Sequence, residues 1–248
     1  MRPSRGRSAR RWLARVGLMV GGVVAVLLLA GLGYELYLPS VSNAEAKTDE
    51  MVRAHHGALS RLPLPSKLGD AVVAVEDEHF YSNVVINVFD GVGRAALASL
   101  QSKGDPAGST IDQQLAKQLY GQGTGISGSL RDLALGVKLS LAYSPNSILE
   151  MYLNVVYYGN HFWGDVAAAR GYFGLAPDHL DWAQAAMLAG LPQAPSAYDP
   201  LHHFALAKQR QLHVLSQLVA NHYLTRVAAR AVFREPLNLR RTPGGTAG

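Results

Sequence analysis

Apolar residues recur at helical spacing through most of the chain beyond residue 64. Sustained alternation of apolar and polar residues, which marks half-buried strands, is not found, and no internal repeat is present. The sequence therefore predicts a mainly α-helical domain. The predicted helices cover residues 68–76, 90–100, 109–119, 129–141, 145–154, 165–173, 181–189 and 205–223, with a last one after residue 225.

Several of these helices have side chains that suit an N-terminal cap. Ser109, Ser144 and Thr225 each stand directly before a helical run, and Pro145 suits the first turn of its helix. The periodicity also predicts which faces are buried. In the 109–119 helix the inward residues are Ile111, Leu115 and Leu119, and in the 129–141 helix they are Leu130, Leu133, Val137 and Leu141.

Residues 16–34 contain no charged side chain. At about 1.5 Å per residue this run crosses most of a hydrocarbon core of roughly 30 Å. Six arginines precede it, so the positive-inside rule places the N-terminus in the cytoplasm and the remaining chain outside. The competing interpretation is a cleaved signal peptide, because residues 44–46 read Ala-Glu-Ala. We favour a single-pass membrane anchor, since the apolar run exceeds the roughly 7 to 15 residues of a signal sequence.

The predicted organisation has five parts. A cytoplasmic basic tail covers residues 1–15, a transmembrane helix residues 16–38 and a juxtamembrane connector residues 39–63. The main folded domain then spans residues 64–235, outside the cell membrane, and a flexible tail closes the chain at residues 236–248.

The net charge of +5 arises from the N-terminal arginines. Without those six, 17 basic residues remain against 18 acidic ones, so the basic balance describes a tail and not a nucleic-acid-binding surface. With 48% hydrophobic residues among 248, the chain can form one substantial core. It has no cysteine, which excludes disulfides and thiolate metal sites and is typical of an extracytoplasmic bacterial protein.

An apolar run ends abruptly in Glu76, Asp77 and Glu78. Adjacent carboxyl groups beside an apolar wall raise one another's pKa by repulsion and desolvation. That environment suits a carboxylate that accepts a proton near neutral pH. A solvated acidic helix end explains these residues equally well.

Thr110, Gln114 and Lys117 share one face of the next predicted helix. A hydroxyl, an amide and an ammonium near a helix N-terminus could hold an anion such as a sugar phosphate, although an ordinary solvated face fits as well. The glycine-rich residues 121–128 have few side chains that could pack and predict a mobile loop beside this site.

Together these segments resemble the peptidoglycan glycosyltransferases of glycosyltransferase family 51. The resemblance covers roughly residues 64–225 and is most specific in four segments. These are E-D-E-H-F at 76–80, G-S-T-I-D-Q-Q-L-A-K at 108–117, I-L-E-M-Y-L-N at 148–154 with Y-G-N after it at 158–160, and A-Q-A-A-M-L-A-G-L-P-Q-A-P-S-A-Y-D-P at 183–200.

The resemblance implies a lysozyme-like, two-lobed helical fold and polymerisation of glycan strands from lipid II. By the same resemblance Glu76 is the catalytic base, the anomeric centre is inverted and polyprenyl pyrophosphate leaves. The expected partners are lipid II, the growing lipid-linked chain, the cytoplasmic membrane and proteins of cell-wall synthesis. A divalent cation, Mg²⁺ or Mn²⁺, is commonly involved in the family, and no organic cofactor is expected. The implied substrate-binding residues are Asp77, Phe80, Ser109, Thr110, Gln113, Gln114, Lys117, Arg131 and Glu150.

The third motif of the family departs from its usual form. Its glutamate, the second catalytic carboxylate, aligns with Asp132, and Arg131 is the one cation beside it in the motif. This leaves two functions open. The chain is either an active polymerase, or a divergent, weakly active or inactive homologue that binds lipid II or cell-wall synthesis proteins. A lysozyme-like hydrolase is a more distant alternative, because it leaves the anchor and the Q-Q-L-A-K segment unexplained.

Overall fold

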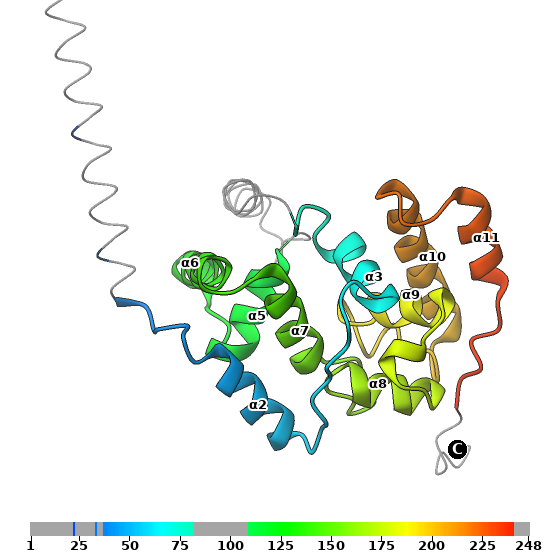
Figure 1. The fold of residues 1–248 in the computed structure, drawn as a ribbon, viewed down its shortest axis with the longest axis horizontal. Coiled ribbons are helices and arrows are strands. Elements are labelled where there is room, and N and C mark those ends of the chain that lie inside the picture. Colours follow the sequence, from blue (N-terminus) through cyan, green and yellow to red (C-terminus); the bar gives the residue numbers. More distant parts are fainter. Residues whose placement is uncertain (1–21, 23–32, 34–36, 82–108, 241–248) are drawn as a thin grey trace, which may run out of the picture. The chain divides into compact units, whose positions relative to one another are not determined.

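The computed structural model describes residues 22, 33, 37–81 and 109–240. The chain divides into two compact units, residues 1–40 and 41–248, and the second unit holds all the helices discussed below. In its described part these are α2 (Ala44–Ala54), α3 (Lys67–Glu76), α5 (Ile111–Tyr120), α6 (Gly125–Ala142), α7 (Pro145–Val155), α8 (Asp165–Phe173), the 3₁₀ turn η1 (Pro177–His179), α9 (Trp182–Gly190), α10 (Phe204–Ala220) and α11 (Arg226–Arg234) (Figure 1).

The prediction of a mainly α domain is confirmed. Among the described residues there is no strand, and the one β-bridge joins Tyr157 to Trp163 across a tight turn. Sequence periodicity located most helices within a few residues. The predicted helix at 165–173 matches α8, while the one predicted at 90–100 lies outside the described residues.

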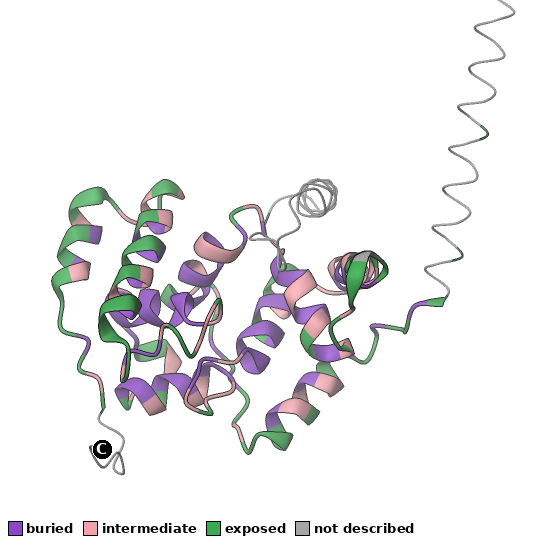
Figure 2. Cartoon of the chain, turned by 180° about the vertical axis from the view of Figure 1, so that it is seen from behind, coloured by how far each residue is buried: buried purple, intermediate pink, exposed green. Residues whose placement is uncertain are grey.

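The helices pack in two groups, as Figure 1 shows. In one, α5 packs against α6, α7 and α2; in the other, α9 and α10 pack against α3, and α11 covers α10. Helix α9 is the centre of the second group, because eight of its nine residues, Ala183–Gly190, are buried (Figure 2). Its alanines and glycine let neighbouring helices approach closely, which places the end of α3 near α10.

Side-chain caps fix where the helices begin. The hydroxyls of Ser144 and Thr225 accept hydrogen bonds from the backbone at the start of α7 and α11, as predicted. At α5 the predicted cap, Ser109, is wrong by one residue. There Thr110 accepts from the Gln113 backbone, so α5 begins at Ile111.

The predicted buried face of the 129–141 helix is wrong in part, since Leu133 and Val137 face α5 but are only half-buried. Helix α6 begins four residues earlier, at Gly125, and buries Leu135 and Leu139, whereas Leu130 is 53% and Leu141 73% exposed. The cause is close packing against α5. A Cβ atom on Gly136 would lie 3.0 Å from Cγ of Gln113, so this glycine lies against α5, whereas Leu130 and Leu141 are exposed.

The helical domain extends beyond both predicted boundaries. In the predicted connector, α2 packs against α5 and α7. In the predicted tail, Leu237 is buried and its carbonyl accepts a hydrogen bond from Gln184. The predicted transmembrane helix at 16–38 lies almost wholly outside the described residues, and no helix within the described part is long and apolar enough to cross a membrane.

Candidate active site

Glu76 is the last residue of α3, where side chains from three helices meet. The rest of α3 is anchored by buried apolar residues from Leu68 to Ala74, which fixes the position of its end. Oε2 of Glu76 accepts a 2.7 Å hydrogen bond from Nε2 of Gln114 on α5. Oε1 lies 3.7 Å from Nη2 of Arg210 on α10, and the Glu76 side chain is 14% exposed. The carboxylate is therefore held from two sides, and its Oε1 is buried.

The orientation of Gln114 follows from its second partner. Its Oε1 accepts a 2.9 Å hydrogen bond from the hydroxyl of Tyr152 on α7, which leaves the amide nitrogen to face Glu76. Tyr152 is fully buried, and burial followed by the charge of Glu76 raises its pKa well above the usual value. The phenol therefore stays protonated and acts as a donor at neutral pH.

Asp77 connects the end of α3 to the start of α5. It is 2% exposed, and its Oδ2 accepts a 3.3 Å hydrogen bond from the backbone nitrogen of Ile111. A carboxylate at a helix N-terminus is also favoured by the helix dipole. Phe80 is 3% exposed and donates its backbone N–H to the Asp77 carbonyl. Their observed contacts stabilise the turn that follows Glu76, and substrate binding by Asp77 and Phe80 stays a prediction.

The predicted anion-binding triplet separates in the structure. Thr110 is 4% exposed, and its hydroxyl caps α5 by accepting a hydrogen bond from the Gln113 backbone. The amide of Gln114 donates a hydrogen bond to Glu76. Lys117 is half-buried further along α5. Ser109 contributes its carbonyl, which lies 3.3 Å from Nε2 of Gln114. Anion binding by this helix end stays a prediction.

Asp132 and Arg131 hold the loop between α5 and α6. Both oxygens of Asp132 lie 3.2 Å from the backbone nitrogen of Gly123, and the residue is 4% exposed. Arg131 donates to the carbonyls of Tyr120 and Gly121 and lies 3.5 Å from Asp132. The loop is thus shorter than the predicted 121–128 and is tied at two points. The catalytic role of Asp132 stays a prediction.

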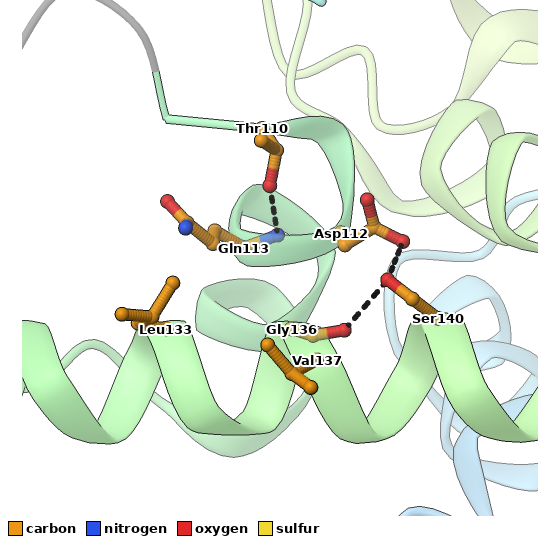
Figure 3. A pocket seen from close by; sticks show the side chains of 7 residues that line it. All are labelled: Thr110, Asp112, Gln113, Leu133, Gly136, Val137 and Ser140. Carbon is orange, nitrogen blue, oxygen red and sulfur yellow. Dashed lines mark hydrogen bonds between the residues drawn. The ribbon is translucent and has the colours of Figure 1, made fainter. Parts of the chain in front are cut away.

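Two further predicted substrate residues lie apart from these contacts. Glu150 is exposed on α7, and its backbone carbonyl accepts from Asn154. Gln113 lines a small, open hollow between α5 and α6 (Figure 3). Asp112 also lines it and accepts a 2.7 Å hydrogen bond from Ser140. Burial raises the pKa of Asp112, and the bond from Ser140 opposes that rise.

Sequence reasoning missed Arg210. It lies on the buried side of α10, three residues after Ala207 and four before Val214, both of which are fully buried. That spacing was the available signal, because an arginine between two core positions of a helix faces the core. Which acid it meets there could not be read from α10 alone.

The described residues do not fit a metal site built from protein ligands. No group of three histidine, aspartate or glutamate side chains among them is close enough to hold a metal ion. Binding of a divalent cation stays a prediction.

Comparison with known proteins identifies the family. The family model described as Transglycosylase matches residues 44–219, well over half of the chain. The chain belongs to the transglycosylase family. It is accordingly a glycosyltransferase enzyme, and the site around Glu76 lies within the matched region.

The relatives differ greatly in length. A protein of Cupriavidus necator named as a transglycosylase is 34% identical over 93% of this chain and 99% of its own length. Penicillin-binding protein 1A of Neisseria flavescens is 36% identical over 71% of this chain, and penicillin-binding protein 2a of Streptococcus pneumoniae 33% over 89%. This chain spans 22% and 34% of those two proteins.

Among solved structures, penicillin-binding protein 1A of Haemophilus influenzae matches with 33% identity and a TM-score of 0.38. The match covers 41% of this chain and 15% of that one.

Proposed function

We propose that this protein polymerises peptidoglycan glycan strands from lipid II, with Glu76 as the general base. Membership of the transglycosylase family supports glycosyl transfer in peptidoglycan synthesis. The observation that carries the finer proposal is the Glu76 carboxylate, which Gln114 and Arg210 hold at the end of a rigid helix and whose side chain is 14% exposed. A general base must be held in a fixed position to remove a proton, and the contacts of Glu76 support that role.

In the proposed reaction Glu76 takes the proton of the acceptor sugar's 4-hydroxyl. The hydroxyl oxygen forms a bond to the anomeric carbon of the donor chain as the bond from that carbon to the pyrophosphate oxygen breaks. The configuration inverts, and the electron pair of the broken bond leaves with the polyprenyl pyrophosphate. Cations and oriented amides near that group would stabilise its developing charge. Lys117 and the N-terminal turn of α5 are our candidates for this role.

We also propose the setting in which the reaction occurs. The arginine-flanked apolar run at residues 16–34 supports an anchor in the cytoplasmic membrane, with the helical domain outside. The two groups of helices around α3, α5, α7 and α10 support a lysozyme-like, two-lobed domain. Fractionation with N-terminal sequencing tests the anchor. A mature protein that begins near residues 43–47 and leaves the membrane would contradict it.

The decisive experiment compares the parent with Glu76→Gln. The detergent-solubilised full chain is incubated with labelled lipid II, and the polymer is separated by gel electrophoresis. Glu76→Gln preserves the shape of the side chain but cannot take a proton, so we expect a rate loss on the order of 10² to 10⁴ with an unchanged melting temperature. Glu78→Gln, a neighbouring exposed position, is the matched control and should behave as the parent.

A second candidate function has one observation in its favour. Asp132, aligned with the family's second catalytic carboxylate, has both oxygens directed at Gly123 and a nearby arginine. If these contacts are its whole role, the protein is a weakly active or inactive homologue that binds lipid II or cell-wall synthesis proteins. Binding of labelled lipid II without any polymer, in a protein with normal stability, would favour this candidate.

A further inference from the structure

Arg210 is held rigidly beside Glu76. Its Nε donates a 3.1 Å hydrogen bond to the carbonyl of Gly190 at the end of α9, and its side chain is 11% exposed. The approach requires a glycine, because a Cβ atom on residue 190 would lie 2.8 Å from Cγ of Arg210. The guanidinium carbon also lies 5.9 Å from the ring centre of Tyr198. Three contacts thus fix where the charge of Arg210 is placed.

The loop that carries Tyr198 is itself anchored. The next residue, Asp199, accepts a 2.8 Å hydrogen bond from Nδ2 of Asn160, and the same nitrogen lies 3.0 Å from the hydroxyl of Tyr172. Asp199 also accepts from the backbone of Leu201. These hydrogen bonds connect the turn around Asn160 to the loop before α10 and hold Tyr198 beside Arg210.

The charges around Glu76 are unevenly distributed. Arg210 contributes a cation from α10, and Tyr152 on α7 and Tyr158 after it contribute phenols that burial keeps protonated. Helix α9 has no titratable residue, and Gln114 of α5 is neutral. Burial lowers the pKa of Arg210, and the carboxylate of Glu76 opposes that change. Each charged group of the pair therefore offsets the desolvation of the other.

We propose that Arg210 is a positioning residue, which keeps the Glu76 carboxylate ionised and holds its buried Oε1 beside α10, so that the base keeps one orientation. This inference rests on the proposed function of Glu76 as the base. Arg210 need not touch substrate, since it acts through the carboxylate. Guanidinium suits the task because it remains charged when buried and can donate to Gly190 and face Glu76 at once.

The test is the pH dependence of kcat/KM for lipid II polymerisation by the full chain in detergent. An opposite charge within about 4 to 6 Å lowers a carboxyl pKa by one unit or more, so Arg210→Gln should move the acidic limb of the profile upward by about one unit. Arg210→Lys keeps the charge and should leave the limb in place, with kcat about tenfold lower because the geometry is looser. Arg230→Gln, an exposed arginine of α11, is the charge-matched control and should change neither.

A purely structural role for Arg210 predicts a different result. Arg210→Gln would then lower activity equally at every pH, and an unmoved limb overturns the proposal. If Arg210→Gln does not fold, Arg210→Lys is the deciding variant. A shifted acidic limb in Arg210→Lys contradicts the role of the charge. A parental kcat in Arg210→Lys contradicts the role in orientation.

A second readout separates this inference from the proposed function. The carboxyl carbon of Glu76 can be titrated by ¹³C NMR, with its signal assigned as the one that Glu76→Gln removes. Arg210→Gln should raise the pKa of that signal by about one unit, whatever the substrate is. If Glu76→Gln polymerises normally, the proposed base is wrong; if the Glu76 signal titrates identically in parent and Arg210→Gln, the positioning role is wrong.

Discussion

The amide of Gln114 donates to Oε2 of Glu76 over 2.7 Å, although the two residues lie 38 positions apart on separate helices. The hydroxyl of Tyr152 fixes the direction of this bond by occupying the amide oxygen. Glu76 therefore depends on the relative placement of α3, α5 and α7, and its properties should respond to changes in Gln114 that leave the fold intact.

We expect Gln114→Glu to move the acidic limb of the kcat/KM profile upward by more than one unit. The variant places a second carboxyl group where the amide now contacts Glu76, and two carboxylates at that distance cannot both ionise easily. Activity at pH 7 should fall more than tenfold and recover partly at higher pH. Gln118→Glu, an exposed position on the same helix, is the matched control. A parental profile for Gln114→Glu would show that the two side chains do not interact in solution.

Asp165 should make the protein less stable as the pH rises toward neutrality. It is fully buried, its Oδ2 accepts a 2.7 Å hydrogen bond from Ser60, and burial raises its pKa to about 7. Its Oδ1 has no hydrogen-bond partner within the described part of the chain. Because the folded pKa lies above the unfolded value, the folded state binds more protons between about pH 4 and 7. The stabilisation is therefore complete at low pH and is lost as the pH passes through 7.

The measurement is the melting temperature of parent and Asp165→Asn at pH 5.5 and pH 8. Asparagine keeps an oxygen for Ser60 and cannot ionise, so the variant should be more stable than the parent at pH 8 and should lose this contribution to the pH dependence. Asp178→Asn, an exposed acid in η1, controls for the loss of charge. Equal differences between variant and parent at the two pH values would contradict the buried titration.

Gly136→Ala should destabilise the packing of α6 on α5. The added Cβ would lie 3.0 Å from Cγ and 3.1 Å from the backbone nitrogen of Gln113, so one helix must move. Overpacking of this kind costs about 1 to 3 kcal/mol. Alanine favours a helix over glycine by about 1 kcal/mol, so any fall in the melting temperature identifies the contact and not the helix propensity. A variant as stable as the parent would mean that the interface is looser than observed.

The sequence predicted the local features of this fold better than its contacts between helices. Caps at Ser144 and Thr225 depend on neighbouring residues alone, and both were found. The predicted buried face of α6 was wrong at Leu130 and Leu141, because leucines occur on several sides of that helix and the choice depends on Gly136 meeting α5.

The site shows the same division. Glu76 stood out because three acids end an apolar run, and the structure holds its carboxylate with a defined set of partners. The pairing of Glu76 with Arg210 was not predictable. Arg210 lies on α10, and the sequence around it does not indicate which acidic residue it contacts. Asp165 was missed as a titratable group for a similar reason: its burial results from packing around α8, whereas its sequence position suggests only a helix start.

Asp132 decides between the two candidate functions. Aspartate is one methylene shorter than the glutamate expected at this position from the family resemblance, and a displacement of about 1 Å can cost around 10²-fold in rate. If Asp132 is the second catalytic carboxylate, Asp132→Asn should lower the turnover of the enzyme on the order of 10²-fold. Asparagine keeps an oxygen for the Gly123 backbone. Asp132→Glu should preserve or raise turnover, although its longer side chain must displace the loop at Gly123 from a nearly buried position.

The alternative for Asp132 is that it only holds the loop beside Arg131. Both variants should then lower the melting temperature and change the rate of lipid II polymerisation little, because the nearly buried Asp132 stabilises the loop through Gly123 and Arg131. Measuring rate and stability on the same preparations separates the two cases. A polymerisation rate for Asp132→Asn equal to that of the parent would remove this residue from the chemistry, and Glu76 would then have to act without a carboxylate partner on α6.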